Sequence, residues 1–143
     1  MFRTAYENGI PTSFDLNLRV DNGVLDPSYR DAVMEIIQYS NYVLGSGAEE
    51  FYYLNPRDSW EDSVRGLVRA GHVMIARMGR NGSKAFSMDE EVERPAFHVT
   101  VEDTVGAGDV YNAGFIAKRL EGGTLSQCLE YGNAVSGYTV ERK

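Results

Sequence analysis

A short stretch of small residues, 102–114, constrains this chain more than any other segment. It reads Glu-Asp-Thr-Val-Gly-Ala-Gly-Asp-Val-Tyr-Asn-Ala-Gly and separates a β-rich run from an apolar pattern with helical spacing. A small-residue loop that leads into a helix offers unpaired backbone N–H groups and the positive end of the helix dipole to an anion. The stretch therefore predicts a cradle for phosphate oxygens.

Asp109 lies in the first turn of the predicted helix. A carboxylate there stabilises the helix end, but it would repel bound phosphate unless it has a task such as accepting a proton from an attacking hydroxyl. The alternative is an ordinary glycine turn with an Asp cap. Spacing excludes two other phosphate-binding loops. Tyr111 occupies the place of the third small residue of a dinucleotide fingerprint, and the Gly-Lys-Ser/Thr of a P-loop is absent from the sequence.

The composition limits the classes of partner. A chain of 143 residues with 43% hydrophobic content can bury a core and suggests one domain. The net charge of -7 argues against nucleic acid and anionic membranes, which attract clustered Lys and Arg. No apolar run is long enough to span a bilayer and no signal-peptide core is visible, so we expect a cytoplasmic protein. The single cysteine, Cys128, excludes an intrachain disulfide.

Short apolar strands alternate with helical patterns along the chain. The predicted strands are 10–16, 42–44, 72–77, 84–87 and 96–101, and 88–94 is predicted to be a solvated loop. Helices are predicted to start after the caps at Asp26, Asp58 and Thr124 and inside the cradle, the second of them reaching Gly71. This order predicts an α/β fold with a largely parallel sheet covered by helices on both faces.

Four polar or glycine-rich segments follow the predicted strands. They are residues 15–19, 45–50, 78–82 and 103–109. Ligands of parallel sheets gather at the carboxyl ends of the strands, so these segments are expected to face one site. His72 and His98 show no partner in the sequence and are interpreted as structural.

The string Asp-Thr-Val-Gly-Ala-Gly-Asp, followed by an aromatic residue and Asn-Ala-Gly-Phe, closely resembles the second signature of the PfkB, or ribokinase-like, carbohydrate kinase family. The similarity spans residues 1–143 as one partial domain, but only the C-terminal half of the family. It implies a truncated ribokinase-like fold without the N-terminal half and lid. It also implies phosphoryl transfer from ATP, with Mg²⁺, to a hydroxyl of a sugar or sugar acid, as in ketodeoxygluconate kinases, fructokinases or ribokinases.

The resemblance implies catalytic roles in the cradle. Asp109 would contact the substrate and accept its hydroxyl proton. Gly106, Ala107 and Gly108 would offer backbone N–H groups to the transferring oxygens. Thr104 is implied to lie with the nucleotide.

Four further polar residues receive roles by the same resemblance. Asp103 would lie near a monovalent cation, for which K⁺ is the candidate, with turn stabilisation as the alternative. Glu50 matches the Glu of an Asn-x-x-Glu turn that arranges water around Mg²⁺, although Gly47 stands where the Asn is usual. The alternative is that Glu50 is an acidic residue at the start of a helix, where it needs no metal. Asn17 and Arg19 match the family's Asp-x-Asn-x-Arg segment and are substrate-binding candidates, with Arg19 meeting a sugar-acid carboxylate.

Four more residues are implied to bind the nucleotide. Gly79 and Gly82 match a Thr-x-Gly-x-x-Gly loop, in which Arg77 stands where Thr is usual. Asn133 and Gly137 lie on the last predicted helix, which in relatives helps to cover the adenine.

The missing half of the family leaves two predictions open. An uncovered sheet edge predicts a homo-oligomer or another association through that edge. The chain is then either a carbohydrate kinase fragment with little activity alone or a non-catalytic remnant that keeps a nucleotide- or anion-binding module.

Overall fold

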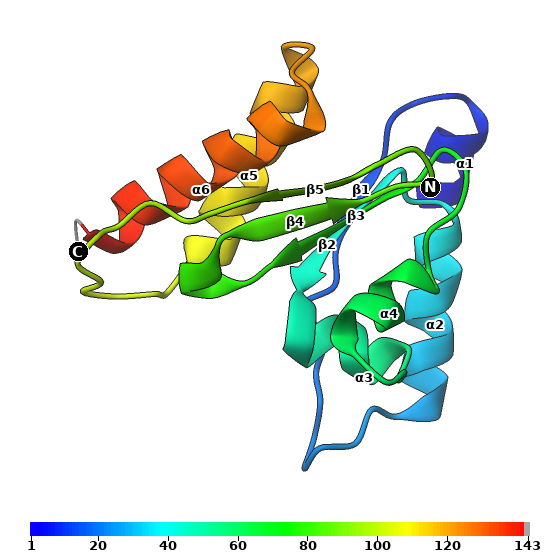
Figure 1. Ribbon diagram of the computed structural model, residues 1–143. Helices are drawn as coiled ribbons and strands as arrows, with labels where there is room; N and C mark the ends of the chain where they lie inside the picture. The colour runs from blue at the N-terminus through cyan, green and yellow to red at the C-terminus, as the bar shows by residue number, and fades with distance from the viewer. Residues whose placement is uncertain (142–143) are drawn as a thin grey trace. The chain divides into compact units, whose positions relative to one another are not determined.

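The computed structural model describes residues 1–141, and its five strands form one sheet in the order β1-β2-β3-β4-β5 (Figure 1). The first two strands pair in parallel, with Phe14 opposite Val43. The sheet is mixed and largely parallel, so the predicted fold class is confirmed. The strands are β1 (Ser13–Asp15), β2 (Tyr42–Ser46), β3 (Val73–Arg77), β4 (Ser83–Phe86) and β5 (Glu91–Arg94).

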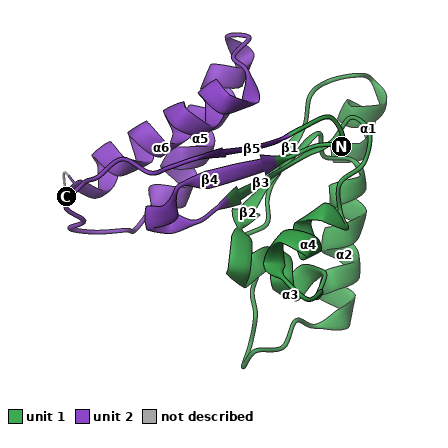
Figure 2. Ribbon diagram, viewed as in Figure 1, with its two compact units in different colours: residues 1–76, 86–90 green, residues 77–85, 91–143 purple. Residues whose placement is uncertain are grey.

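Two compact units divide the chain (Figure 2). Unit 1 comprises residues 1–76 and 86–90, and unit 2 comprises residues 77–85 and 91–143. Unit 1 contains α1 (Phe2–Glu7), α2 (Pro27–Gln38), a π-helical turn (Gly47–Phe51), α3 (Tyr52–Leu54) and α4 (Trp60–Arg65). Unit 2 contains a 3-10 turn (Gly79–Asn81), α5 (Ala107–Leu120) and α6 (Leu125–Glu141).

Local capping chemistry sets the helix starts. The Asp26 carboxylate accepts a hydrogen bond from the Tyr29 N–H at 3.0 Å, with Pro27 as the first helical residue of α2. At α6 the capping box is reciprocal, because the Thr124 N–H donates to Gln127 Oε1 at 2.9 Å and the Gln127 N–H donates to Thr124 Oγ1 at 3.2 Å. Both predicted caps are confirmed.

Helix α4 is shorter than predicted. Ser59, rather than Asp58, caps it by accepting from the Asp62 N–H at 3.1 Å, and the helix ends at Arg65. Beyond it, backbone hydrogen bonds reach back three residues instead of four. The Leu67 N–H, for example, donates to the Val64 carbonyl at 2.9 Å. The predicted extension to Gly71 is therefore wrong.

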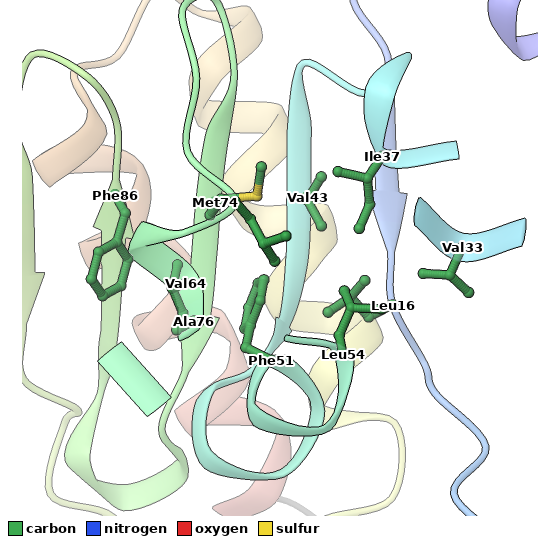
Figure 3. Packing of buried hydrophobic residues seen from close by; sticks show 11 residues of the cluster. Leu16, Val33, Ile37, Val43, Phe51, Leu54, Val64, Met74, Ala76 and Phe86 are labelled. Carbon is green, nitrogen blue, oxygen red and sulfur yellow. The ribbon is translucent and has the colours of Figure 1, made fainter. Parts of the chain in front are cut away.

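A cluster of apolar side chains forms the core of unit 1 (Figure 3). It joins strands β1 to β3 to helix α2 and to the helical segment 47–67. Phe51, Leu54 and Val64 are fully buried in it. The members are Leu16, Val33, Ile37, Val43, Phe51, Leu54, Val64, Leu67, Met74, Ala76 and Phe86.

Unit 2 is built differently, around two packed helices and a buried chain of hydrogen bonds. Helices α5 and α6 lie side by side, and Gly132 permits the close approach because a Cβ there would lie 2.8 Å from the Tyr111 ring (Figure 2). The Tyr111 hydroxyl donates to Ser83 Oγ at 2.6 Å, and the Ser83 hydroxyl donates to Asn133 Oδ1 at 3.0 Å. Burial raises the pKa of the Tyr111 phenol, so it stays protonated as the donor.

The strand predicted at 96–101 is absent, and the strand β5 lies at Glu91–Arg94, where a loop was predicted. Pro95 has no N–H to continue a ladder. The Asn133 amide donates to the carbonyl oxygens of Arg94 and Pro95, at 3.2 and 3.1 Å, and holds the chain away from strand geometry. The half-buried residues of this segment are Ala96 and Val99, three apart, so the apparent alternation did not reflect two faces of a strand.

No helix of the described residues combines the length and the apolar character that crossing a membrane requires.

Candidate active site

The cradle loop is shaped by its own side chain and backbone. Asp103 Oδ1 accepts a hydrogen bond from the Val105 N–H at 2.9 Å, which closes a short turn. Gly106 follows in the left-handed region, at φ +79°, directly before the first residue of α5. A side chain would be strained there although its Cβ would meet no atom within 4 Å. The loop therefore stays bare on its outer side.

The start of α5 presents open backbone donors beside a carboxylate. The Ala107 N–H donates to the Thr104 carbonyl at 3.2 Å, whereas the N–H groups of Gly106 and Gly108 donate to no acceptor within residues 1–141. Asp109 lies exposed in the first turn. Within the same described residues, no hydrogen bond engages its carboxylate. One helical turn thus offers amides for an anion and an oxygen that can accept a proton.

Arg77 is the residue at this turn whose role the sequence did not predict. It is the last residue of β3, and its Nη1 donates to Asn112 Oδ1 at 2.5 Å and to the Gly108 carbonyl at 3.3 Å. Its partners lie 31 and 35 positions away in the sequence. The only sequence signal was a charged residue where the resemblance led us to expect Thr.

The two glycines of the loop after β3 differ in surroundings. Gly79, at φ +57°, is exposed and a Cβ there would meet no atom within 4 Å. Gly82, at φ +90°, is buried, and a Cβ there would collide with the Arg94 carbonyl oxygen. Gly79 is therefore open to a ligand. At position 82 the close approach of residues 94–96 leaves no room for a side chain, which explains the glycine there.

Asn133 and Gly137 lie on α6 under other parts of unit 2. The Asn133 amide accepts from Ser83 and donates to the Arg94 and Pro95 carbonyls, so its hydrogen-bonding groups hold the chain. A Cβ on Gly137 would lie 3.6 Å from Val99, which therefore packs over this position.

In unit 1, Glu50 braces the segment that contains the predicted substrate residues. Glu50 Oε2 accepts from the Leu18 N–H at 2.6 Å, and Oε1 accepts from the Ser46 N–H at 2.8 Å. Asn17 has φ +38° and is exposed, as is Arg19. The brace holds the backbone at residue 18 and leaves both flanking side chains facing solvent.

The surroundings of Glu50 fit a cation contact through water better than direct ligation. The Ser46 hydroxyl, next to the Glu50 brace, is buried and has no hydrogen-bond partner among residues 1–141. An ordered water satisfies such a group, and both carboxylate oxygens of Glu50 already accept from backbone amides. The described part of the chain has no group of three or more His, Cys, Asp or Glu residues that could hold a metal ion.

The model of the pfkB family carbohydrate kinases matches residues 5–143. The ATP-dependent ribose-1-phosphate kinase of Halopiger xanaduensis is 30% identical over 141 residues, which are 99% of this chain and 44% of that protein. The 5-dehydro-2-deoxygluconokinase of Clostridium perfringens is 28% identical, over 96% of this chain and 42% of its own length.

Solved structures of kinases also resemble this chain over nearly its whole length. An Escherichia coli protein described as a ribokinase II, crystallised with ATP and Mg²⁺, matches with a TM-score of 0.88 and 28% identity. The match covers 99% of this chain and 46% of that protein. The nucleoside kinase of Methanocaldococcus jannaschii matches with a TM-score of 0.71 and 27% identity, over 93% and 42% of the two chains. The chain thus spans less than half the length of each of these four proteins.

Proposed function

Because the chain belongs to the pfkB family of carbohydrate kinases, we propose that it forms the nucleotide-binding and catalytic part of an ATP-dependent kinase for a hydroxyl of a sugar or sugar acid. One observation supports this most directly. The exposed Asp109 carboxylate and the open N–H groups of Gly106 and Gly108 share the first turn of α5.

In the proposed reaction the substrate hydroxyl oxygen forms a bond to the γ-phosphorus of ATP. The bond from that phosphorus to the β–γ bridging oxygen breaks, and ADP leaves with its electron pair. Asp109 accepts the hydroxyl proton, while the N–H groups of Gly106, Ala107 and Gly108 stabilise the charge on the transferring oxygens. Mg²⁺, when bound with ATP, neutralises charge on the phosphates. Ala107 can take part by exchanging its 3.2 Å bond to Thr104 for a phosphate oxygen.

The other proposed nucleotide contacts differ in how they can act. Thr104 and Gly79 are exposed and can touch a ligand directly. Gly82, Asn133 and Gly137 are engaged by the chain, so we assign them to the walls of the nucleotide site. Asp103 is the candidate neighbour of K⁺.

For the substrate, Asn17 and Arg19 remain the proposed contacts, with Arg19 meeting a carboxylate. Glu50 would hold the backbone between them through Leu18 and would act on Mg²⁺ through water. The relatives named above act on a ribose phosphate and on a sugar acid by their names, which supports a polar, anionic sugar as the first class to test.

The test combines calorimetry and turnover on the full chain. ATP is titrated with and without Mg²⁺, and ADP release is then measured over sugars, sugar acids and nucleosides. We expect weak ATP binding and very low turnover. Asp109→Asn should retain ATP binding and reduce any turnover by about a thousandfold. No ATP binding at millimolar concentration would contradict the proposal.

A second candidate is a non-catalytic module that binds a nucleotide or another anion. The open N–H groups of Gly106 and Gly108 favour it, because they would hold an anion whether or not a hydroxyl substrate is bound. ATP binding with no ADP release from any substrate, equal in the parent and Asp109→Asn, would favour this module over the kinase.

Association through a sheet edge remains part of the proposal. Light scattering between micromolar and millimolar chain concentration tests it. A stable monomer throughout would contradict it.

A further inference from the structure

Arg77 connects the end of β3 to the turn of α5 that carries Asp109. Its Nη1 donates both to the Gly108 carbonyl and to Asn112 Oδ1, which lie one helical turn apart and flank the carboxylate in sequence. The two hydrogens of Nη1 lie in the plane of the guanidinium, so their directions are fixed, whereas an ammonium on a flexible stem rotates its donors freely. The contact therefore fixes a direction as well as a distance.

The guanidinium lies against the face of Gly108 where a side chain would be. A Cβ at position 108 would lie 3.4 Å from Arg77 Nη1 and 3.5 Å from Cζ, which is ordinary van der Waals contact. The guanidinium thus packs on the bare side of Gly108, whose carbonyl it binds and whose N–H stays open.

The charge of Arg77 argues against a purely stabilising role. A cation near a helix N-terminus is disfavoured by the helix dipole, so a neutral side chain would anchor this turn at lower electrostatic cost. The same charge and dipole together favour an anion at the open amides.

From these contacts we propose that Arg77 is a positioning residue for phosphoryl transfer. It holds the first turn of α5 so that the Gly106 and Gly108 amides and the Asp109 carboxylate keep one orientation toward the phosphates of ATP. The inference rests on the proposed function. Misplacing reacting groups by about 1 Å costs about a hundredfold in rate, which gives such a residue a large effect without contact to the substrate.

The experiment compares Arg77→Met, Arg77→Lys, Asn112→Ala and the Arg77→Met/Asn112→Ala pair. Arg80→Met, in the same loop and exposed, is the matched control for loss of one charge. ATP and inorganic tripolyphosphate are titrated by calorimetry, and hydrogen exchange is followed at the Val110 amide, which bonds the Gly106 carbonyl at 3.1 Å.

We expect Arg77→Met to weaken ATP binding about tenfold, and Arg77→Lys to restore less than half of the loss on a logarithmic scale. The double variant should be no weaker than Arg77→Met alone, because the two residues act as one unit. Arg80→Met should stay within about twofold of the parent, as for an exposed charge. Full rescue by Lys, additive losses, or equal effects of Arg77→Met and Arg80→Met would overturn the proposal.

Two controls separate this inference from its premise. Phe115→Leu lowers stability in the buried part of α5 and should leave ATP affinity unchanged below its unfolding temperature. If the parent chain binds neither ATP nor tripolyphosphate, the proposed function fails. The ligand-free exchange still decides whether Arg77 positions the turn. Faster exchange at Val110 in Arg77→Met supports positioning if Arg77→Lys does not return it to the parent rate and Arg80→Met does not reproduce it. Unchanged exchange in Arg77→Met overturns the proposal.

Discussion

Within each of its two units, this protein is stabilised by a different kind of contact. Unit 1 encloses a cluster of eleven apolar residues, all between Leu16 and Phe86. Unit 2 buries fewer large apolar side chains and adds the chain from Tyr111 through Ser83 to Asn133. Apolar burial is non-directional and tolerates repacking, whereas hydrogen bonds require fixed geometry. The unit that carries Asp109 therefore has the contacts that orient groups most strictly.

The largest effect should come from the apolar cluster of unit 1. Phe51 is fully buried there. Phe51→Ala should lower the free energy of unfolding by about 3–5 kcal/mol in urea titrations, because it removes apolar contacts and leaves a cavity. Phe51→Leu, which keeps most of the volume, should lose less than about 1.5 kcal/mol. Equal losses for the two variants would mean that packing does not dominate this unit.

The next effect tests how closely unit 2 is packed at its backbone. Gly82→Ala places a Cβ on the Arg94 carbonyl oxygen at φ +90° and should lower the free energy of unfolding by about 3 kcal/mol. Gly79→Ala is the matched variant, with positive φ but no atom within 4 Å, and should lose only about 1 kcal/mol. Thermal and urea unfolding measure both. A loss at Gly79 as large as that at Gly82 would contradict the packing argument.

A smaller loss is expected when the hydrogen-bond chain is cut. Tyr111→Phe removes the donor to Ser83 and should lower the free energy of unfolding by about 1–2 kcal/mol. Tyr131→Phe, on the exposed side of α6, should change it by less than about 0.5 kcal/mol. If the two substitutions behave alike in urea, the chain does not stabilise unit 2.

The smallest effect concerns a directed contact inside the apolar unit. His72 is buried, and its Nδ1 donates to the Ser40 carbonyl at 2.6 Å while its Nε2 accepts from the Tyr6 hydroxyl at 2.9 Å. Burial lowers the pKa of His72 below its usual value of 6.5. The unfolded chain then binds the proton more readily. The free energy of unfolding should therefore fall as the pH drops through about 6.5 and toward the lowered pKa.

Urea titrations between pH 8 and pH 5 measure this dependence. His72→Asn should flatten the fall in stability, with His98→Asn as the control for removing a histidine. The same slope in His72→Asn and the parent would show that His72 does not contribute.

The sequence predicted features that depend on neighbouring residues. The caps at Asp26 and Thr124 and the turn before α5 are local, because donors and acceptors lie within three residues of one another. The family and the largely parallel sheet also followed, the first from one contiguous motif and the second from alternating strands and helices.

Features that depend on distant partners were not predicted. The conformation of the chain at residues 94–95 depends on hydrogen bonds from Asn133, nearly forty positions further along. The contact of Arg77 with α5 likewise depends on an acceptor in a distant element. The pattern of a single segment carries no information about such partners. Side-chain hydrogen bonds between distant segments are therefore seen only in the folded structure.

The hydrogen-bond chain of unit 2 has only one possible arrangement of protons. The carbonyl oxygens of Arg94 and Pro95 can only accept, so Asn133 must turn its NH₂ toward them and its oxygen toward Ser83. Ser83 must then give its proton to Asn133, and it can only receive one from Tyr111. Two peptide carbonyls thereby dictate every proton up to the phenol. Tyr111, two positions after Asp109, is thereby held as a hydrogen-bond donor. It is not available as a base at this turn, which leaves Asp109 as the proposed proton acceptor.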